Sequence, residues 1–436
     1  MNFDIMLNNV VKVKINILTK KIVLIIIAFL YGLNDSSLVV GGFQIPLLRF
    51  FLVLLGVVAL LEHFTIKKMK NEQIFDKKYF KILLRSYFSK ENGFSIFMMS
   101  TWLIYALSSF FWVQSILNWR SAINFIVVGF FCTVVFSLFL KTKKDIFQTF
   151  QIMGIIAIIH NVIGWYEVLT QNHLFRGYIQ WGRRPVSVFY NTNNFAVFLF
   201  ISIFILYALG ERSRNLHLKI LYKVMSASSI SLVFFTQSRG VIMSVLISLT
   251  AFFILSNFEK IKKLLEIKRS RVIFIGTSFL ITVAIAMTLF YVFIGNLDIS
   301  TADRITLVRN GVVFFTSTNG RGVGAGNIEY WMEMHRQFEL YRHDMNIHNW
   351  WLEILVAYGI VVFSLYIIFY YKLFKSNFLK FAKSTNQIDK SFSKAVMCIM
   401  IGFLIASIVP STLIFHIFHW VFWAVMIAFQ GIPLEE

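Results

Sequence analysis

The sequence predicts an all-α integral membrane protein with about twelve transmembrane helices. Of its 436 residues, 58% are apolar and only 14% are charged, and the mean hydropathy is +0.71. A soluble domain of ordinary composition carries about 25% charged residues. Four prolines and the lack of sustained alternating segments favour a helical bundle over an outer-membrane barrel.

Apolar runs of about 20 residues recur along the chain, and each can cross the hydrocarbon core once. No repeat with a period of 20 to 50 residues relates them, which counts weakly against a transporter built from duplicated halves. We therefore treat residues 1–436 as a single polytopic domain. The predicted spans are 17–36, 42–62, 95–113, 120–140, 146–168, 188–209, 219–237, 239–257, 272–295, 348–371, 393–410 and 412–430.

The basic residues predict how these spans are oriented. With the amino terminus in the cytoplasm, 31 of the 42 Lys and Arg fall on the cytoplasmic side, including all 26 Lys. The 11 on the opposite face are all Arg. By the positive-inside rule both termini are then cytoplasmic. This distribution accounts for the net charge of +21 through topology and contacts with anionic membrane lipids, so we expect no nucleic-acid partner.

A polar stretch at residues 296–347 separates the ninth and tenth predicted spans. It contains five Arg and two His, and we expect it to form a large extracytoplasmic loop. Long loops in compact proteins are usually functional or disordered. The prediction is that this loop carries part of an active site.

Two candidate clusters lie before this loop on the outer face. Arg183 and Arg184 precede Asn191 and Asn194 at the start of the sixth span. Buried amides need hydrogen-bond partners, so these Asn are either helix caps or contacts to a polar ligand. Arg239 lies in a tight turn between apolar helices, where a charge is costly and marks either a functional site or a side chain that reaches lipid headgroups.

Two further clusters lie in the loop and at its end. Arg304, Arg309 and Arg321 are candidates to bind anions through their planar guanidinium groups. The glycines around Arg321 match no nucleotide-binding motif, and both a plain turn and amides that bind an anion or sugar stay open. His348 and Asn349 begin the tenth span, and His348 can act as a base or a donor near neutral pH.

The sequence predicts no metal site. His416 and His419 lie one helical turn apart, but no Cys or clustered carboxylate accompanies them. The tryptophans that follow Asn349 fit either a membrane-interface belt or a surface on which sugars stack.

In their order along the chain, these clusters resemble the O-antigen ligase and polymerase superfamily. The resemblance covers about residues 185–371. Thr192 stands where the family usually has the Pro of N-P-N. The motifs are G-R-R-P followed by N-T-N-N-F-A, then T-Q-S-R-G, D-R-I-T-L-V-R-N, G-V-G-A-G-N and H-N-W-W-L-E-I-L-V-A-Y-G.

The resemblance implies a multi-pass glycosyltransferase of the bacterial cytoplasmic membrane that needs no metal or other cofactor. Its donor is an oligosaccharide on undecaprenyl pyrophosphate and its acceptor is a glycan, with a chain-length regulator as an open candidate partner. Arg239 and Arg304 would meet the pyrophosphate charge, and His348 would activate the acceptor hydroxyl. The implied substrate contacts are Arg183, Arg184, Asn191, Asn194, Arg309, Arg321 and Asn349.

Three functions stay open. A polymerase joins repeat units of a capsule, exopolysaccharide, O-antigen or teichuronic-type polymer, and the form of the H-N-W-W-L-E-I-L-V motif favours it. A ligase transfers finished chains to a lipid A core or another acceptor. A lipid-linked glycan flippase would keep its ionisable groups near the midplane, whereas here they cluster at the outer surface.

Overall fold

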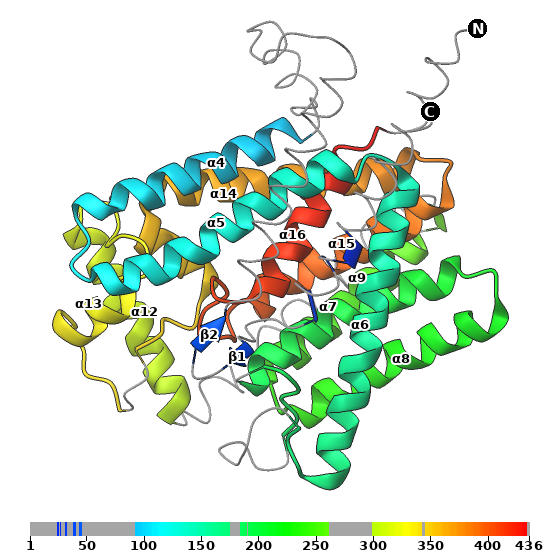
Figure 1. Cartoon of the computed structure of the whole chain (residues 1–436), viewed down its shortest axis with the longest axis horizontal. Coiled ribbons are helices and arrows are strands. Elements are labelled where there is room, and N and C mark those ends of the chain that lie inside the picture. Colours follow the sequence, from blue (N-terminus) through cyan, green and yellow to red (C-terminus); the bar gives the residue numbers. More distant parts are fainter. Residues whose placement is uncertain are drawn as a thin grey trace, which may run out of the picture.

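The computed structural model describes residues 24–25, 27, 31–32, 38–40, 43–45, 92–174, 184–189, 191–260, 299–341 and 345–433. Apart from a hairpin of β1 (Leu38–Val40) and β2 (Phe43–Ile45), its regular elements are helices. Figure 1 shows their arrangement. The helices are α4 (Gly93–Ser108), the 3₁₀ turn η1 (Ser109–Phe111), α5 (Ile116–Phe139), α6 (Lys143–Thr170), α7 (Thr192–Arg212), α8 (Leu216–Phe235), α9 (Arg239–Ser256), α12 (Ile299–Ser317), α13 (Ile328–Met334), α14 (Trp350–Lys383), α15 (Gln387–Ala406) and α16 (Ile417–Gln430).

The membrane-protein prediction is confirmed at the level of the fold. Within the described residues, seven helices are long and apolar enough to cross a membrane, counting α4 together with η1: α4, α5, α6, α7, α8, α9 and α14. Together with α15 and α16 they correspond to nine of the predicted spans. The spans predicted at 17–36, 42–62 and 272–295 lie wholly or largely outside the described residues.

Helix starts follow local capping chemistry. The side chains of Ser115, Thr142, Asn191, Asn349 and Asn386 each accept a hydrogen bond from a backbone N–H in the first turn of the helix that follows. Such caps satisfy amides that would otherwise lack a partner. Because capping depends on residues near in sequence, the predicted and observed starts agree within a few residues for most spans.

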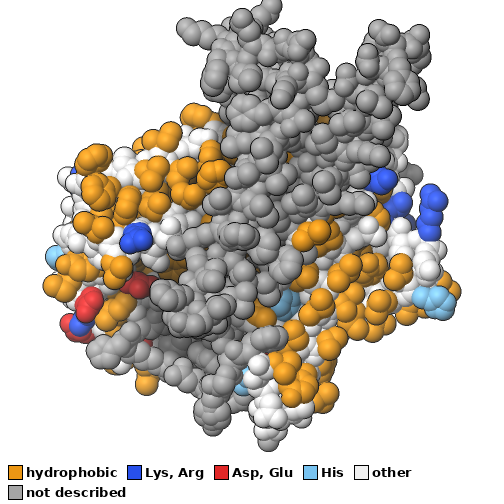
Figure 2. Space-filling model, in the orientation of Figure 1, with side chains coloured by type: hydrophobic (Ala, Val, Ile, Leu, Met, Phe, Trp, Pro, Cys, Tyr) orange, Lys and Arg blue, Asp and Glu red, His pale blue; other side chains and the backbone are white. Residues whose placement is uncertain are grey.

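The centre of the bundle is α16, in which every residue is buried. It lies against α5 and is flanked by α14 and α6 (Figure 1). Trp102, Trp350 and Trp420 pack around its first turn, with ring centroids 5.6 to 6.4 Å apart. On the outer helices, by contrast, large apolar side chains cover much of the surface seen in Figure 2, as expected for helices that face lipid.

The connections predicted to share a face also contact one another. Asn327, in the predicted outer loop, accepts a hydrogen bond from Ser115 N at 2.7 Å in the connection between α4 and α5. Among the connections predicted to be cytoplasmic, Lys143 pairs with Asp389 at 2.8 Å and Lys394 with Glu211 at 3.1 Å. These contacts agree with the grouping of the connections that the sequence predicts, while the orientation of the two groups in the membrane stays a prediction.

Three local predictions were wrong. The hairpin occupies residues 38–45, where a turn and the start of the second span were expected. About half of the stretch at 296–347 is helical, because α12 and α13 lie within it. The last span starts at Ile417 rather than at residue 412. The chain from Ser407 to His416 is irregular, and within it the Thr412 side chain donates a hydrogen bond to Glu353.

Candidate functional site

The helix α12 buries one face and carries Arg304, which is half-buried, and Arg309, which is exposed, outside that face. Its buried face consists of Asp303, Leu307, Asn310 and Phe314, at the spacing of successive helical turns. Asp303 Oδ1 accepts a hydrogen bond from Tyr341 N at 2.7 Å. Asn310 Oδ1 accepts from the backbone N–H groups of residues 337 and 338, at 2.9 and 3.0 Å. These bonds hold the segment that leads to His348 along α12.

Two residues predicted from separate motifs, Arg304 and His348, contact Val409, and a third, Arg239, is next in the chain to a residue that packs against it. Arg304 Nη2 lies 3.5 Å from the Val409 carbonyl oxygen, and His348 Nδ1 lies 3.4 Å from the same atom. On another side, Gly240 packs so closely that an added Cβ would collide with the Val409 side chain. Arg239 precedes this glycine, so the connection between α15 and α16 brings Arg239, Arg304 and His348 into one neighbourhood.

The conformation of His348 suits it to proton transfer. Because a carbonyl oxygen only accepts, its contact with Val409 requires a hydrogen on Nδ1, which leaves Nε2 as the acceptor nitrogen of the neutral ring. His348 also has a φ of 48°, a left-handed backbone that few residues other than glycine adopt. Such positions cluster at functional sites because the surrounding structure must hold them.

The electrostatics of this neighbourhood favour anions. Arg239 is the first residue of α9, and His348 and Asn349 come directly before α14. The amino-terminal end of a helix carries partial positive charge and exposed N–H groups. Two helix starts and two arginines around Val409 therefore suit a phosphate-bearing group.

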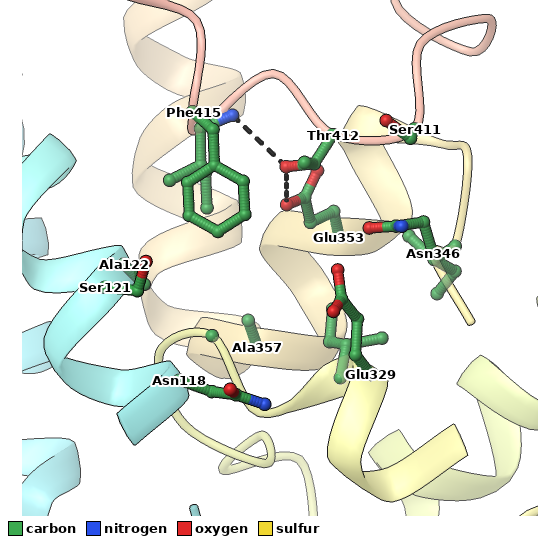
Figure 3. A pocket seen from close by; sticks show the side chains of 14 residues that line it. Asn118, Ser121, Ala122, Glu329, Asn346, Glu353, Ala357, Ser411, Thr412 and Phe415 are labelled. Carbon is green, nitrogen blue, oxygen red and sulfur yellow. Dashed lines mark hydrogen bonds between the residues drawn. The ribbon is translucent and has the colours of Figure 1, made fainter. Parts of the chain in front are cut away.

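A cavity of about 160 Å³, whose wall is partly polar and partly apolar, lies next to this cluster (Figure 3). The starts of α5, α13 and α14, the residues before His348 and the connection between α15 and α16 all contribute to its wall. Glu353 is its most buried charged side chain, with 7% exposed, and Thr412 donates a hydrogen bond to its Oε1 atom. In Figure 3 the side chain of Glu329 points across the cavity toward Glu353.

The glycine-rich segment at 320–326 is a structural lock. The helix α14 breaks at Gly359, where φ is 71° and ψ is −177°. Across the break, Val323 N and Gly324 N donate to the carbonyls of residues 356 and 357, both at 2.9 Å, and Ile360 N donates to Gly320 O at 3.0 Å. The amides of Val323 and Gly324 already have partners, so neither a flexible turn nor an anion-binding loop describes this segment.

Replacing Gly359 with Ala is expected to lower the thermal unfolding temperature in detergent and to reduce function. The added Cβ would collide with the carbonyl oxygens of Gly320 and Arg321. The backbone conformation itself costs a non-glycine residue on the order of 1–3 kcal/mol. Gly320→Ala is the matched control, because Gly320 also has positive φ but its nearest neighbour would be a ring atom of Phe315 at 3.4 Å. Equal unfolding temperatures for the two variants would contradict the lock.

The other predicted site residues are placed as follows. Asn349 and Asn191 are helix caps. Asn194 is buried, and its Oδ1 has no hydrogen-bond partner among the described residues. Arg184 is partly buried before α7 and Arg309 is exposed on α12, whereas Arg183 lies outside the described residues.

Arg321 belongs to the lock rather than to the cluster around Val409. Its guanidinium group lies 4.9 Å from the ring centre of Trp112, and its carbonyl oxygen accepts a hydrogen bond from Tyr105 Oη at 2.7 Å. The side chain is exposed, so this cation–π contact still leaves it accessible.

Trp350 and Trp351 were expected to lie either in a membrane-interface belt or on a sugar-stacking surface. Trp350 lies in neither place. It is 1% exposed and donates from Nε1 to Tyr366 Oη at 2.9 Å. Trp351 donates to Leu404 O at 3.2 Å and packs on the rings of Tyr366 and Tyr370. The Trp350 bond thus lies within α14, whereas the bond from Trp351 joins α14 to α15.

Reasoning from the sequence missed Glu353 and Thr412. Glu353 had a signal, because an ionisable residue one turn inside a membrane-length helix is a functional candidate by default. Its position in the first turn of α14, where a carboxylate offsets the helix dipole, also has a purely structural explanation. Thr412 carried no local signal, since its role depends on Glu353, 59 residues away.

Comparison with known proteins agrees with this arrangement. Residues 224–367 match the family model described as O-antigen ligase. The predicted resemblance to the O-antigen ligase and polymerase superfamily is confirmed over this segment. The chain is also 26% identical over 342 residues to the teichuronic acid biosynthesis protein TuaE of Bacillus subtilis (strain 168), covering 75% of this chain and 69% of that protein.

The matched segment contains most of the site described above. It runs from within α8 to within α14 and includes Arg239, Arg304, His348 and Glu353. The segment with Arg184, Asn191 and Asn194 precedes it. The chain is thus a multi-pass membrane protein that is similar to membrane proteins of the polysaccharide polymerase and ligase type.

Proposed function

We propose that this protein is a polysaccharide polymerase that transfers undecaprenyl-pyrophosphate-linked repeat units onto an acceptor glycan at the outer face of the bacterial cytoplasmic membrane. The observation that carries the proposal is that Arg304 and His348 both contact the Val409 carbonyl, while Gly240, the residue after Arg239, packs against the Val409 side chain. The relative from Bacillus subtilis is a teichuronic acid biosynthesis protein by name, which supports a polymer as the product. In this proposal both termini are cytoplasmic.

In the proposed reaction, the acceptor hydroxyl oxygen forms a bond to the anomeric carbon of the donor sugar. The bond from that carbon to the pyrophosphate oxygen breaks, and undecaprenyl pyrophosphate leaves with additional negative charge. Arg239 and Arg304 stabilise this charge, with Arg183 or Arg184 as further donor contacts. Fixed charges of this kind are usually the largest single contribution to catalysis. No metal is required in this scheme.

His348 accepts the proton of the attacking hydroxyl on Nε2 in the same scheme. The contact between Nδ1 and the Val409 carbonyl keeps the ring in the required tautomer. A well-placed general base accelerates a reaction by about 10²–10⁴-fold. Asn349 supports this geometry by capping α14 directly after His348, while Asn191, Asn194, Arg309 and Arg321 remain proposed contacts to the sugars or the pyrophosphate.

An apolar groove offers a place for the polyprenyl tail of the donor. It has a volume of about 620 Å³, lies between α14 and α15, and begins at Trp351, close in sequence to His348. Its other wall residues include Phe363, Ile367, Tyr371 and Leu404. A lipid whose pyrophosphate is bound by the arginines could lay its chain along this groove, within the apolar layer.

Purified protein in detergent or liposomes is expected to convert the lipid-linked repeat unit alone into longer lipid-linked oligomers, in the presence of EDTA. Gel electrophoresis or mass spectrometry of the products measures the length of these oligomers. A requirement for a second acceptor would identify a ligase. Movement of the donor across liposomes with no new glycosidic bond would instead identify a transporter and contradict the proposed reaction.

A further inference from the structure

The cavity in Figure 3 contains a carboxylate whose hydrogen bonding is incomplete. Glu353 Oε1 accepts the Thr412 hydroxyl and the Leu413 backbone N–H also approaches the carboxyl group, but Oε2 is buried and has no hydrogen bond of full geometry among the described residues. Burying a charged oxygen without a partner is unfavourable, and buried polar atoms in folded proteins nearly always have one. Since Glu353 lines the cavity, the missing donor is expected from a molecule bound within it.

Hydroxyl or amide groups are the donors that fit this cavity. Its polar wall supplies side-chain oxygen atoms from Glu329, Asn118, Asn346, Ser411 and Thr412 in addition to Glu353. Carboxylates accept hydrogen bonds and offer no cation to an anion. On the face shown in Figure 2, acidic side chains gather beside α12 and α13, while many of the basic side chains lie at the opposite edge.

The cavity and the arginine cluster share the same chain segments. Ile347 lines the cavity, and the next residue is His348. Likewise, Ser411 and Thr412 line it, and Val409 lies just before them in the chain. The connection between α15 and α16 therefore contacts Arg304 and His348 through Val409 and lines the cavity with Glu353 through Ser411 and Thr412.

We propose that the cavity between Glu329 and Glu353 is the subsite for the acceptor sugar, and that it takes an uncharged, hydroxyl-bearing residue in preference to a uronic acid or a phosphorylated sugar. This inference rests on the proposed function. The separation of charge assigns the two substrates: the pyrophosphate of the donor binds at the arginines, and the neutral acceptor residue binds at the carboxylates. Glu353 then acts as a specificity and positioning residue beside His348.

Binding without turnover is the first test. Saturation-transfer NMR on the full-length protein in detergent, without donor, would compare a neutral oligosaccharide that ends in an N-acetylhexosamine with a matched one that ends in a hexuronic acid. The wild type is expected to bind the neutral probe more tightly. Glu353→Gln is expected to weaken that binding by about 10- to 100-fold, the range for a hydrogen bond to a charged group. No binding of the neutral probe to the wild type would overturn the assignment.

Kinetics provide the second readout. With the lipid-linked donor held constant, Glu353→Gln is expected to raise the KM for the neutral acceptor far more than it lowers kcat. Glu329→Gln, on an accessible helix where folding is less at risk, is expected to reduce the preference for the neutral over the acidic acceptor. The matched control is Glu333→Gln, because Glu333 is exposed on α13 and does not line the cavity. Unchanged acceptor KM values in both cavity variants would contradict the proposal.

The outcomes separate this inference from the proposed function. Sugar binding that depends on Glu353, without any transfer, would retain the subsite and refute the polymerase. Loss of binding in EDTA, with recovery on adding Ca²⁺ or Mg²⁺, would show that the carboxylates hold a cation and would overturn the subsite.

Discussion

Arg239→Ala is expected to lower glycan transfer by about 10²–10³-fold, the usual cost of removing one fixed donor to a developing negative charge. The abundance of the Arg239→Ala protein in the membrane should stay near that of the wild type, because Arg239 is exposed at the start of α9. Arg239→Lys should restore little activity, since the planar fork that binds phosphate through two hydrogen bonds is lost. Transfer from the lipid-linked donor in membranes or purified protein measures both variants.

Arg214→Ala is the matched control for this experiment. Arg214 is also exposed, but it lies in the connection between α7 and α8, away from Val409. Arg304→Ala should behave like Arg239→Ala. Because both arginines surround Val409, the double variant should lose less than the product of the two single losses, as expected for neighbours that act on one group. Full activity in Arg239→Ala would remove this residue from the site.

His348→Ala is expected to lower transfer by about 10²–10⁴-fold while donor binding persists. The arginines, rather than the histidine, hold the pyrophosphate in the proposed mechanism. A shift of the unfolding temperature on adding the lipid-linked donor measures binding, and single-turnover transfer measures the chemistry. Loss of binding together with transfer would show that His348 contacts the donor instead.

His348→Gln distinguishes a base from a positioning residue. A glutamine amide can still donate to the Val409 carbonyl, but it cannot accept a proton at neutral pH. This variant should therefore be as inactive as His348→Ala. His217→Ala serves as the control, because His217 is exposed near the start of α8. Substantial activity in His348→Gln would assign His348 a positioning role only.

The sequence predicted much of the candidate site because the relevant signals are local. Arg239 was recognised as a charge in a short turn, and His348 as a residue at the entrance of a span. Their meeting was inferred only from the resemblance to a family. The contact that joins Arg304 to Val409 spans 105 positions, and the one that joins His348 to Val409 spans 61. No periodicity or composition predicts a contact at such separations.

The glycines at 320–326 show how a local interpretation fails. In sequence they are typical of a flexible turn or an anion-binding loop, because both need backbone freedom. Only the break at Gly359 reveals that their amides satisfy carbonyls of α14. Likewise, the tryptophans after Asn349 read as interface residues, yet Trp350 is a core residue that packs against the rings of Trp102 and His419.

The sequence by itself determined the fold class and the positions of most described helices. Hydrophobic length and helix capping are properties of nearby residues, and they act in the same way whatever the rest of the chain does. Tertiary structure alone decided that Val409 joins the cationic residues, that the glycine segment locks α14, and that Glu353 lines a cavity with Thr412. Each of these three features depends on packing between segments that are distant in the sequence. The local sequence around one residue does not predict which distant residue it will contact.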